Sequence, residues 1–161
     1  MVIFVAWQLL YTFVLLPIRI PDKFLTNVTA WSTCHFLSLF YSNVEPVYVH
    51  SLSRRLALIK INNAKIIGVA DPCNALDIYV LYISFLFCFP GKWKRRLIFI
   101  LLGVPYIFFL NTIRCAMIAW LNINYRGWVE ISHHYLFTTA LYLLVFYVWV
   151  LYTKKEMQDV P

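Results

Sequence analysis

The sequence predicts an all-α integral membrane protein with about four transmembrane helices, a small external β-hairpin and an interfacial helix before the second span. The 161 residues are 62% hydrophobic and only 13% charged, which leaves too little polar surface to cover a soluble globule. Four apolar runs approach the roughly 20 helical residues that cross a bilayer core. Basic residues gather in short clusters beside these runs, as expected for topology signals.

The predicted spans are Val2–Ile18, Asn74–Phe89, Leu97–Leu121 and Tyr135–Tyr152. The first run lacks a basic start and a small-residue cleavage site, so we expect an uncleaved anchor rather than a signal peptide. The stretch "PGKWKRR" separates the second and third runs, and "TKKE" follows the fourth. The positive-inside rule assigns both clusters to the cytoplasm, which puts both termini inside and two segments outside.

The first external segment, Arg19–Pro72, contains two recognisable patterns. Its "VTAWSTCHFLSLFY" is amphipathic and too polar for a span, so we expect an interfacial or re-entrant helix. The later "LALIKINNAKIIGV" alternates partly around Asn62-Asn63, which predicts a two-stranded hairpin leading into Cys73. The sequence gives no role for residues 24–50.

Charge and cysteine usage exclude several classes of function. The net charge of +7 lies in clusters beside apolar runs, which indicates lipid headgroup contacts rather than nucleic-acid binding. The four cysteines show no paired spacing, so we expect neither a disulfide framework nor a zinc knuckle; they are Cys34, Cys73, Cys88 and Cys115. We expect no cofactor and no bound metal.

The expected membrane topology places three polar groups at the same depth in the bilayer. Cys73 opens the second span at the outer surface. Arg114 follows Leu97 by 17 residues, so it sits about 25 Å along the third span, close to the outer headgroups. His133 and His134 close the second external loop just before the last span. All three elements are therefore expected to meet at the outer leaflet.

The residues before Cys73 suggest a way to activate its thiol. Asp71 is a good helix N-cap, and Pro72 suits the first helical position. Cys73 then falls in the second position, where free backbone N–H groups and the helix dipole favour an anion and lower a thiol pKa. The alternative is a small buried cysteine with a packing role, which is how we interpret the other three cysteines.

Arg114 is a permanent cation inside the apolar stretch "FFLNTIRCAMIAW", so it needs a partner or a route to water. Asn111, one helical turn earlier on the same face, can orient the guanidinium or bind a substrate backbone. The alternative is that Arg114 only snorkels to the headgroups.

The histidine pair fits an aromatic belt with polar edges, a metal site or a general base. A metal site would require further ligands, which the chain offers only at unpromising spacing. A cysteine and a histidine suffice for thiol acyl transfer, and an arginine could stabilise either the oxyanion or the thiolate.

In this chain a cysteine follows a small β element, "NTIR" comes next, and "SHHYLF" precedes the final span. This order of motifs resembles that of the exosortase and archaeosortase family of membrane transpeptidases. The resemblance covers about Ala57–Tyr152. It implies Cys73 as nucleophile, Arg114 as its electrostatic partner and His133 as acid/base, with His134 as the alternative. The family usually has a glycine two residues after the cysteine, where this chain has Ala75. Many members also have about eight spans, so this chain resembles a compact form.

The resemblance implies cleavage of C-terminal sorting signals, each made of a short recognition motif, a transmembrane helix and a basic cluster. The cysteine would form a thioester with the exported protein and release the tail, for surface attachment or release. Asn111 and Asn74 are the candidates for orienting the substrate. The implied partners are membrane-anchored protein substrates and the lipid bilayer, and the implied location is the inner (cytoplasmic) membrane, with the active site facing outward.

On this reading residues 1–161 form a single polytopic membrane domain. It consists of an anchor span (1–18), an external segment (19–72), a catalytic core with three spans (73–152) and a cytoplasmic tail (153–161). A different class of function is a non-catalytic membrane scaffold, in which Arg114 pairs with an acid on another subunit. A transporter is a weaker interpretation, because the chain shows no paired broken helices or repeated halves.

Overall fold

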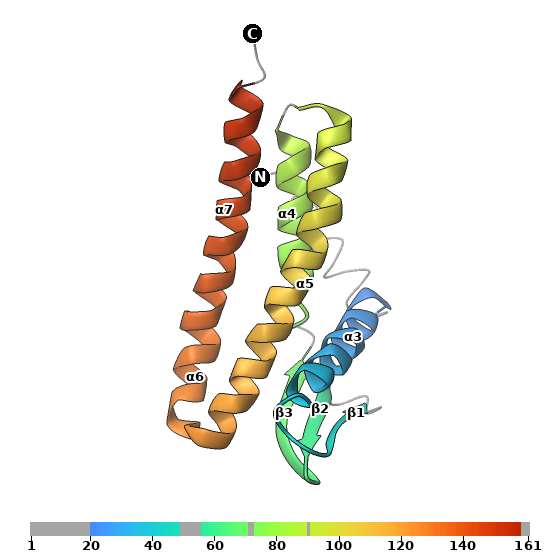
Figure 1. Ribbon diagram of the computed structural model, residues 1–161, viewed down its shortest axis with the longest axis vertical. Helices are drawn as coiled ribbons and strands as arrows, with labels where there is room; N and C mark the ends of the chain where they lie inside the picture. Colours follow the sequence, from blue (N-terminus) through green and yellow to red (C-terminus); the bar gives the residue numbers. More distant parts are fainter. Residues whose placement is uncertain (1–19, 49–55, 71–72, 90, 159–161) are drawn as a thin grey trace.

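Figure 1 shows the computed structural model, which describes residues 20–48, 56–70, 73–89 and 91–158. The predicted anchor span 2–18 lies outside these residues. The described chain combines long helices with one small sheet, in the order α3 (Ile20–Leu37), β1 (Val44–Tyr48), β2 (Leu56–Ile61), β3 (Ala64–Ala70), α4 (Leu76–Cys88), α5 (Trp93–Asn124), η3 (Arg126–Trp128), α6 (Val129–Ile131), η4 (Ser132–Leu136) and α7 (Phe137–Gln158).

Helices α4, α5 and α7 run side by side along the long axis of the molecule (Figure 1). Within the described residues, α5 and the Phe137–Lys154 part of α7 are long and apolar enough to cross a membrane. Helix α4 is apolar but has only 13 residues, about 20 Å of helix, so it is shorter than a bilayer core. The third and fourth predicted spans therefore correspond to helices of sufficient length, and the second to a shorter one.

The two ends of the helical bundle differ in character. The connection between α4 and α5, with its basic cluster, lies at the same end as the C-terminal part of α7, whereas the sheet, α3 and the turn between α5 and α7 lie toward the other (Figure 1). At the basic end Arg95 donates a hydrogen bond of 2.9 Å to the carbonyl oxygen of Tyr152, which ties α5 to α7. The direction of this bundle in a membrane stays a prediction.

The small β element has three strands in the order β1-β2-β3, all antiparallel. The predicted hairpin is present as β2 and β3, and its turn residues Asn62 and Asn63 have φ of 50° and 66°. Asparagine tolerates this left-handed conformation, which suits a two-residue turn between twisted strands. Strand β1 was not predicted, because it is short and contains Pro46, which lacks a backbone donor and is acceptable only at a sheet edge.

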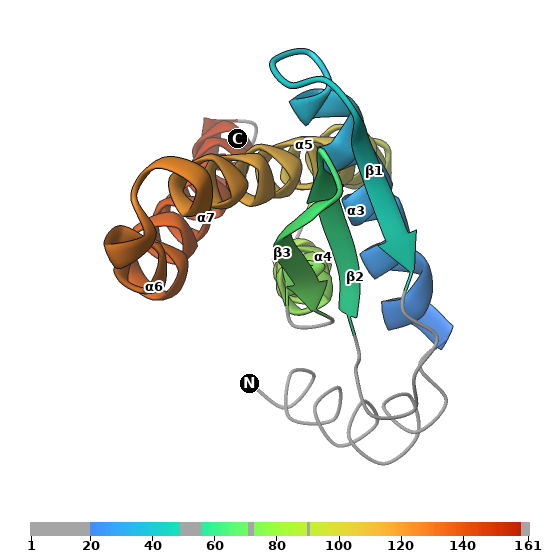
Figure 2. The same ribbon diagram turned by 90° about the horizontal axis from the view of Figure 1, so that it is seen from below.

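Helix α3 begins at Ile20 and ends at Leu37, so it starts earlier than the amphipathic pattern indicates. It packs between the sheet and α5 (Figure 2). This core contains several small side chains, which let the helix backbones approach closely; its buried members are Ala30, Cys34, Leu37, Ala57, Ile59, Val69, Ala116 and Ala119. Helix α3 thereby becomes part of the scaffold around the start of α4.

Candidate active site

Cys73 lies in the short connection between β3 and α4, where it has 3-10 conformation, and not in the first turn of α4. Helix α4 begins at Leu76, and its N-cap is Ala75, with φ 63° and ψ 18°. The predicted capping order, with Cys73 at the second helical position, is therefore wrong; its members Asp71 and Pro72 lie outside the described residues. The helix starts later because Ala75 turns the backbone into the left-handed region, which helical residues do not adopt.

Ala75 has a left-handed backbone conformation. It occupies the position where the resemblance to the exosortase and archaeosortase family predicts glycine. Alanine pays a steric penalty of about 1–2 kcal/mol in this region, whereas glycine enters it freely. The Ala75 side chain is nonetheless buried at 4% exposure in the core between α4, α5 and α7. The chain thus keeps the backbone bend after Cys73 although it lacks the glycine.

Asn74 anchors the connection between β3 and α4 through side-chain hydrogen bonds to α3 and to the start of α4. Its Nδ2 donates to Oδ1 of Asp22 on α3 at 2.8 Å, and its Oδ1 accepts from the backbone N–H of Leu76 at 2.9 Å. Asn74 is 2% exposed and Asp22 is 1% exposed, so the pair is shielded from water. Nδ2 also lies 3.4 Å from Oγ1 of Thr26, one turn further along α3. The single asparagine therefore connects α3, the Cys73 segment and the first turn of α4.

Asn111 holds Cys73 from α5. Its Nδ2 donates to the backbone carbonyl oxygen of Cys73 at 2.9 Å, and the residue is fully buried. Its Oδ1 is also buried and has no hydrogen-bond partner among the described residues. Both asparagines thus direct their amides at the protein around Cys73, and their role in orienting a substrate stays a prediction.

Cys73 itself is half-buried at the edge of the core between α3, the sheet and α5. Cys115 is buried on α5, within electrostatic range of both Cys73 and Arg114. This shared neighbour, together with Asn111, places Cys73 and Arg114 in one region of the molecule.

The remaining cysteines have different surroundings. Burial raises the pKa of the Cys34 thiol to about 11, so it stays protonated at neutral pH and is a poor nucleophile. Cys88 is exposed at the far end of α4. Of the four cysteines, Cys73 alone is partly accessible at the end of α4 that lies near Arg114.

Arg114 lies one turn beyond Asn111 on α5, an advance of about 4.5 Å along the helix. Its Nη2 donates to Oγ1 of Thr138 on α7 at 3.4 Å, a long bond that bridges α5 and α7. Its Nε is buried and has no hydrogen-bond partner in the described part of the chain. The Arg114 guanidinium therefore has an N–H group without a hydrogen-bond partner among the described residues, where α5 and α7 meet.

The histidine pair belongs to a turn of π-helix, Ser132–Leu136, which leads directly into α7. The side chains of His133 and His134 lie outside the described atoms, but the backbone of His134 precedes Thr138 by one helical turn. Single π-helical turns are rare and occur frequently at functional sites. Nothing in the sequence indicated this irregular turn.

An apolar cavity of about 370 Å³ lies next to this turn. Its lining comes from the C-terminal part of α5, the connection and the start of α7, and includes Met117, Trp120, Leu121, Trp128, Ser132 and Phe137. Among the described residues no group of three or more His, Cys, Asp or Glu side chains could hold a metal ion.

The family of the protein follows from comparison with known proteins. The family model described as transmembrane exosortase matches residues 1–153. The chain belongs to the transmembrane exosortase family. No curated protein and no solved structure matches the chain significantly. Membership makes this exosortase a membrane protein in contact with the lipid bilayer, and it supports a transpeptidase-type activity on protein substrates.

The family match also extends the resemblance beyond the Ala57–Tyr152 range that the motifs indicated. It includes α3, whose Asp22 and Thr26 contact Asn74 beside the candidate nucleophile. Sequence reasoning missed these residues because Asp22 and Asn74 are 52 positions apart and neither belongs to a recognisable motif. It missed Thr138 of the exosortase for the same reason.

Proposed function

We propose that this exosortase is a cysteine transpeptidase that cleaves C-terminal sorting signals of exported proteins through a thioester on Cys73. The observation that carries the proposal is the hydrogen bond of 2.9 Å from Asn111 to the Cys73 carbonyl. It fixes the cysteine beside the turn of α5 that carries Arg114, so the nucleophile and the cation come from neighbouring positions.

The proposed reaction has two acyl-transfer steps. A histidine of the π-helical turn, His133 or alternatively His134, takes the proton of the Cys73 thiol, and the sulfur attacks the scissile carbonyl carbon. The C–N bond breaks, the same histidine protonates the departing amine, and the tail of the sorting signal leaves. An amine or water then attacks the thioester, the C–S bond breaks, and Cys73 recovers its proton.

Arg114 is the proposed stabiliser of the oxyanion in both steps. Developing charge on the carbonyl oxygen is favoured by a donor that is already in position, and a single such donor contributes about 10²–10³ in rate. The bond to Thr138 uses one Nη, while Nε has no partner among the described residues. In this scheme Asn74 and Asn111 act as positioning residues that hold the Cys73 segment.

The arrangement also supports the proposed location in the inner (cytoplasmic) membrane, with both termini in the cytoplasm. The basic connection between α4 and α5 lies at one end of the bundle, and the Cys73 segment lies toward the opposite end (Figure 1). Cys73 would then face the outer side, where it meets a peptide bond just outside the transmembrane helix of a substrate.

The test is the processing of a tagged exported protein that carries a C-terminal sorting signal, in cells that contain the full chain. Cys73→Ala is expected to abolish the size shift of the substrate while the variant remains abundant in membranes. Cys88→Ala, at the exposed cysteine on the far end of α4, is the matched control and is expected to process normally. Hydroxylamine is expected to release a thioester-linked fragment from the wild type only.

Normal processing by Cys73→Ala would contradict the proposal. The scaffold alternative predicts a different pattern: Cys73→Ser is silent, and Arg114→Leu dissociates a complex seen by native purification. The two patterns are mutually exclusive, so one set of variants separates them.

A further inference from the structure

Two further thiols lie near the candidate nucleophile and have no role in the proposed reaction. Cys115 of α5 and Cys34 of α3 are each 3% exposed, whereas Cys73 is partly accessible. A thiol close to a nucleophilic cysteine can attack that cysteine when its sulfur is oxidised, and the product is a disulfide. The two buried thiols are therefore candidate partners of Cys73 in thiol chemistry.

Three observations place Cys115 close to Cys73. Asn111 donates its hydrogen bond of 2.9 Å to the Cys73 carbonyl oxygen, and Cys115 follows Asn111 by one helical turn on the same face of α5. Cys73 packs against the core that includes Ala116, the residue next to Cys115. Cys115 also lies within electrostatic range of Cys73. The Cys73 segment and the Cys115 turn of α5 are therefore neighbours.

Cys34 is the competing partner, because it belongs to the core against which Cys73 packs. Burial alone raises the pKa of the Cys34 thiol to about 11, and Cys73 makes no contribution to this shift. The charge of Cys73 does act on Cys115. Of the two buried thiols, Cys115 is therefore the one that interacts with Cys73.

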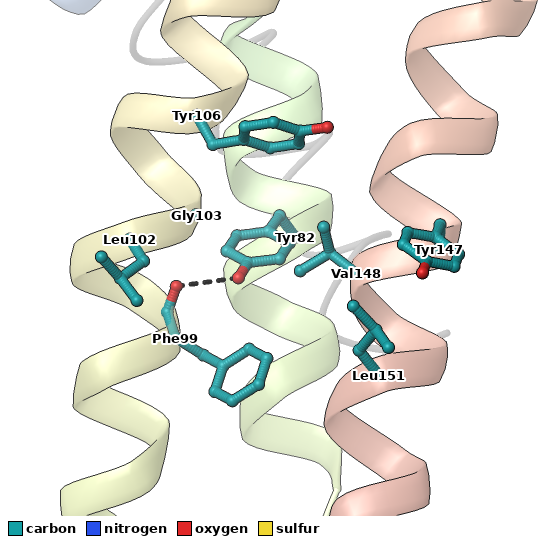
Figure 3. Close-up of a pocket in the computed structure, with 8 residues that line it drawn as sticks. All are labelled: Tyr82, Phe99, Leu102, Gly103, Tyr106, Tyr147, Val148 and Leu151. Carbon is teal, nitrogen blue, oxygen red and sulfur yellow. Dashed lines mark hydrogen bonds between the residues drawn. The ribbon is translucent and has the colours of Figure 1, made fainter.

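Helix α4 is fastened to α5, which limits movement of Cys73 relative to Cys115. Toward the basic end of the bundle, Tyr82 of α4 donates a hydrogen bond of 2.8 Å to the Phe99 carbonyl oxygen of α5 (Figure 3). A Cβ at Gly103 would overlap the Tyr82 hydroxyl, so the absence of a side chain there lets the two helices pack closely. Together with the bond from Asn111 to Cys73, this contact holds the segment against α5 at two levels.

We propose that Cys115 is the resolving thiol for an oxidised Cys73, and that the two form a disulfide which blocks the nucleophile reversibly. Hydrogen peroxide is the oxidant. The Cys73 sulfur attacks one peroxide oxygen, an S–O bond forms, the O–O bond breaks and water leaves, so that Cys73 becomes a sulfenic acid. The Cys115 sulfur then attacks the Cys73 sulfur, the S–S bond forms, the S–O bond breaks, and the oxygen leaves as water with the Cys115 proton. The two thiols lose two electrons, and the peroxide is reduced to two water molecules.

Burial assigns the two roles. A small oxidant reaches the partly accessible Cys73, whereas Cys115 is shielded from it and meets only the neighbouring sulfur. The proposed location of Cys73 at the outer side of the membrane matters here, because thiols outside the cytoplasm are not kept reduced by glutathione and thioredoxin. The disulfide would protect Cys73 from irreversible oxidation to sulfinic acid. The inference rests on the proposed function, since it names a regulation of the same nucleophile.

Counting thiols tests the pair directly. The full chain with Cys88→Ala, which removes the exposed thiol, is placed in phosphatidylethanolamine and phosphatidylglycerol vesicles with a tagged substrate and treated with hydrogen peroxide. After denaturation, a maleimide coupled to polyethylene glycol counts the remaining thiols on a gel. We expect three labelled thiols before treatment, one after it and three again after dithiothreitol. Mass spectrometry of the digested chain is expected to find the Cys73 peptide joined to the Cys115 peptide.

Cys115→Ala and Cys34→Ala form a matched pair in this background, because each removes one sulfur from a side chain that is 3% exposed. Cys34→Ala is expected to form the disulfide, to lose processing in proportion to the chains that are linked, and to recover it with dithiothreitol. Cys115→Ala is expected to process the substrate normally before treatment. After treatment it is expected to contain no disulfide and to lose processing permanently, because Cys73 advances to sulfinic acid.

Three results would overturn the inference: a Cys73 peptide joined to Cys34, no linked peptide in the parent chain, or full recovery of oxidised Cys115→Ala with dithiothreitol. A disulfide requires Cα atoms within about 7 Å of each other, so the linked peptide also tests the contact on which the inference depends. This measurement uses the parent chain and decides the pair even where Cys115→Ala fails to fold.

The same vesicles distinguish failure of this inference from failure of the proposed function. If Cys73→Ala still processes the substrate, the proposed function fails, whatever the thiol counts show. If Cys73 is required for processing but no linked peptide forms, only the role of Cys115 is refuted.

Discussion

Replacing Asn74 with alanine is expected to loosen the segment that carries Cys73. Alanine removes the donor that Asp22 receives at 2.8 Å and the acceptor that the Leu76 N–H uses at 2.9 Å. Because Asp22 and Asn74 are 1% and 2% exposed, water does not readily replace either bond.

The magnitude follows from these two bonds. A hydrogen bond to a charged group contributes about 1.5–3 kcal/mol, and a bond to a free N–H at a helix start contributes about 1 kcal/mol. The contact of 3.4 Å to Thr26 exceeds the usual hydrogen-bond range and adds little. The total of about 3 kcal/mol lowers Tm by about 9 °C in a chain of this size.

The assay is thermal unfolding in detergent, combined with the rate of maleimide labelling at Cys73. Asn124→Ala, at an exposed asparagine near the end of α5, is the control and is expected to change stability by less than about 0.5 kcal/mol. The exchanged pair Asp22→Asn with Asn74→Asp rebuilds an amide-to-carboxylate bond and is expected to recover most of the loss. An unchanged Tm together with unchanged labelling in Asn74→Ala would refute the reasoning.

Other predictions concern the backbone, the cation and the thiols. Ala75→Gly is expected to be tolerated, whereas Ala75→Val is expected to lower the free energy of unfolding by about 2 kcal/mol, because a β-branched residue fits the left-handed region poorly. Thermal unfolding measures the difference, and equal Tm values for the two variants would contradict it. Arg114→Gln is expected to lower kcat for substrate processing about 100-fold, and Thr138→Val by less than tenfold, as measured in the vesicle assay; normal turnover by Arg114→Gln would exclude its role. Burial raises the pKa of the Cys34 thiol to about 11, so the thiol stays protonated at neutral pH. The rate at which maleimide labels Cys34 should therefore stay low from pH 6 to 9 and rise only as the pH approaches 11. Rapid labelling at pH 7 would contradict the burial of Cys34.

Local patterns in the sequence predicted much of the scaffold. The long apolar runs predicted the helices α5 and α7, because the length and hydropathy of a span are local properties. Asn62-Asn63 predicted the hairpin, because the conformation of a two-residue turn depends on the residues within it. The order of Cys73, Arg114 and the histidine pair pointed to the exosortase family, which the family match over residues 1–153 confirms.

Predictions failed where one segment's conformation depended on a distant one. The pattern Asp71, Pro72, Cys73 resembles a helix start, yet α4 begins at Leu76. The backbone there is held by Asn74, whose partner Asp22 lies on a helix that the sequence left without a role. Propensity at a helix start amounts to about 1 kcal/mol, so a buried amide-to-carboxylate bond can override it.

The sequence by itself therefore determined that the chain is an apolar helical protein with a hairpin, and which family it belongs to. Only the tertiary structure decided how Cys73 is held, through Asn74 from α3 and Asn111 from α5. It also decided that Arg114 of α5 reaches Thr138 of α7. The physical reason is that spans and turns form from neighbouring residues, whereas a site is formed by contacts between residues far apart in the chain.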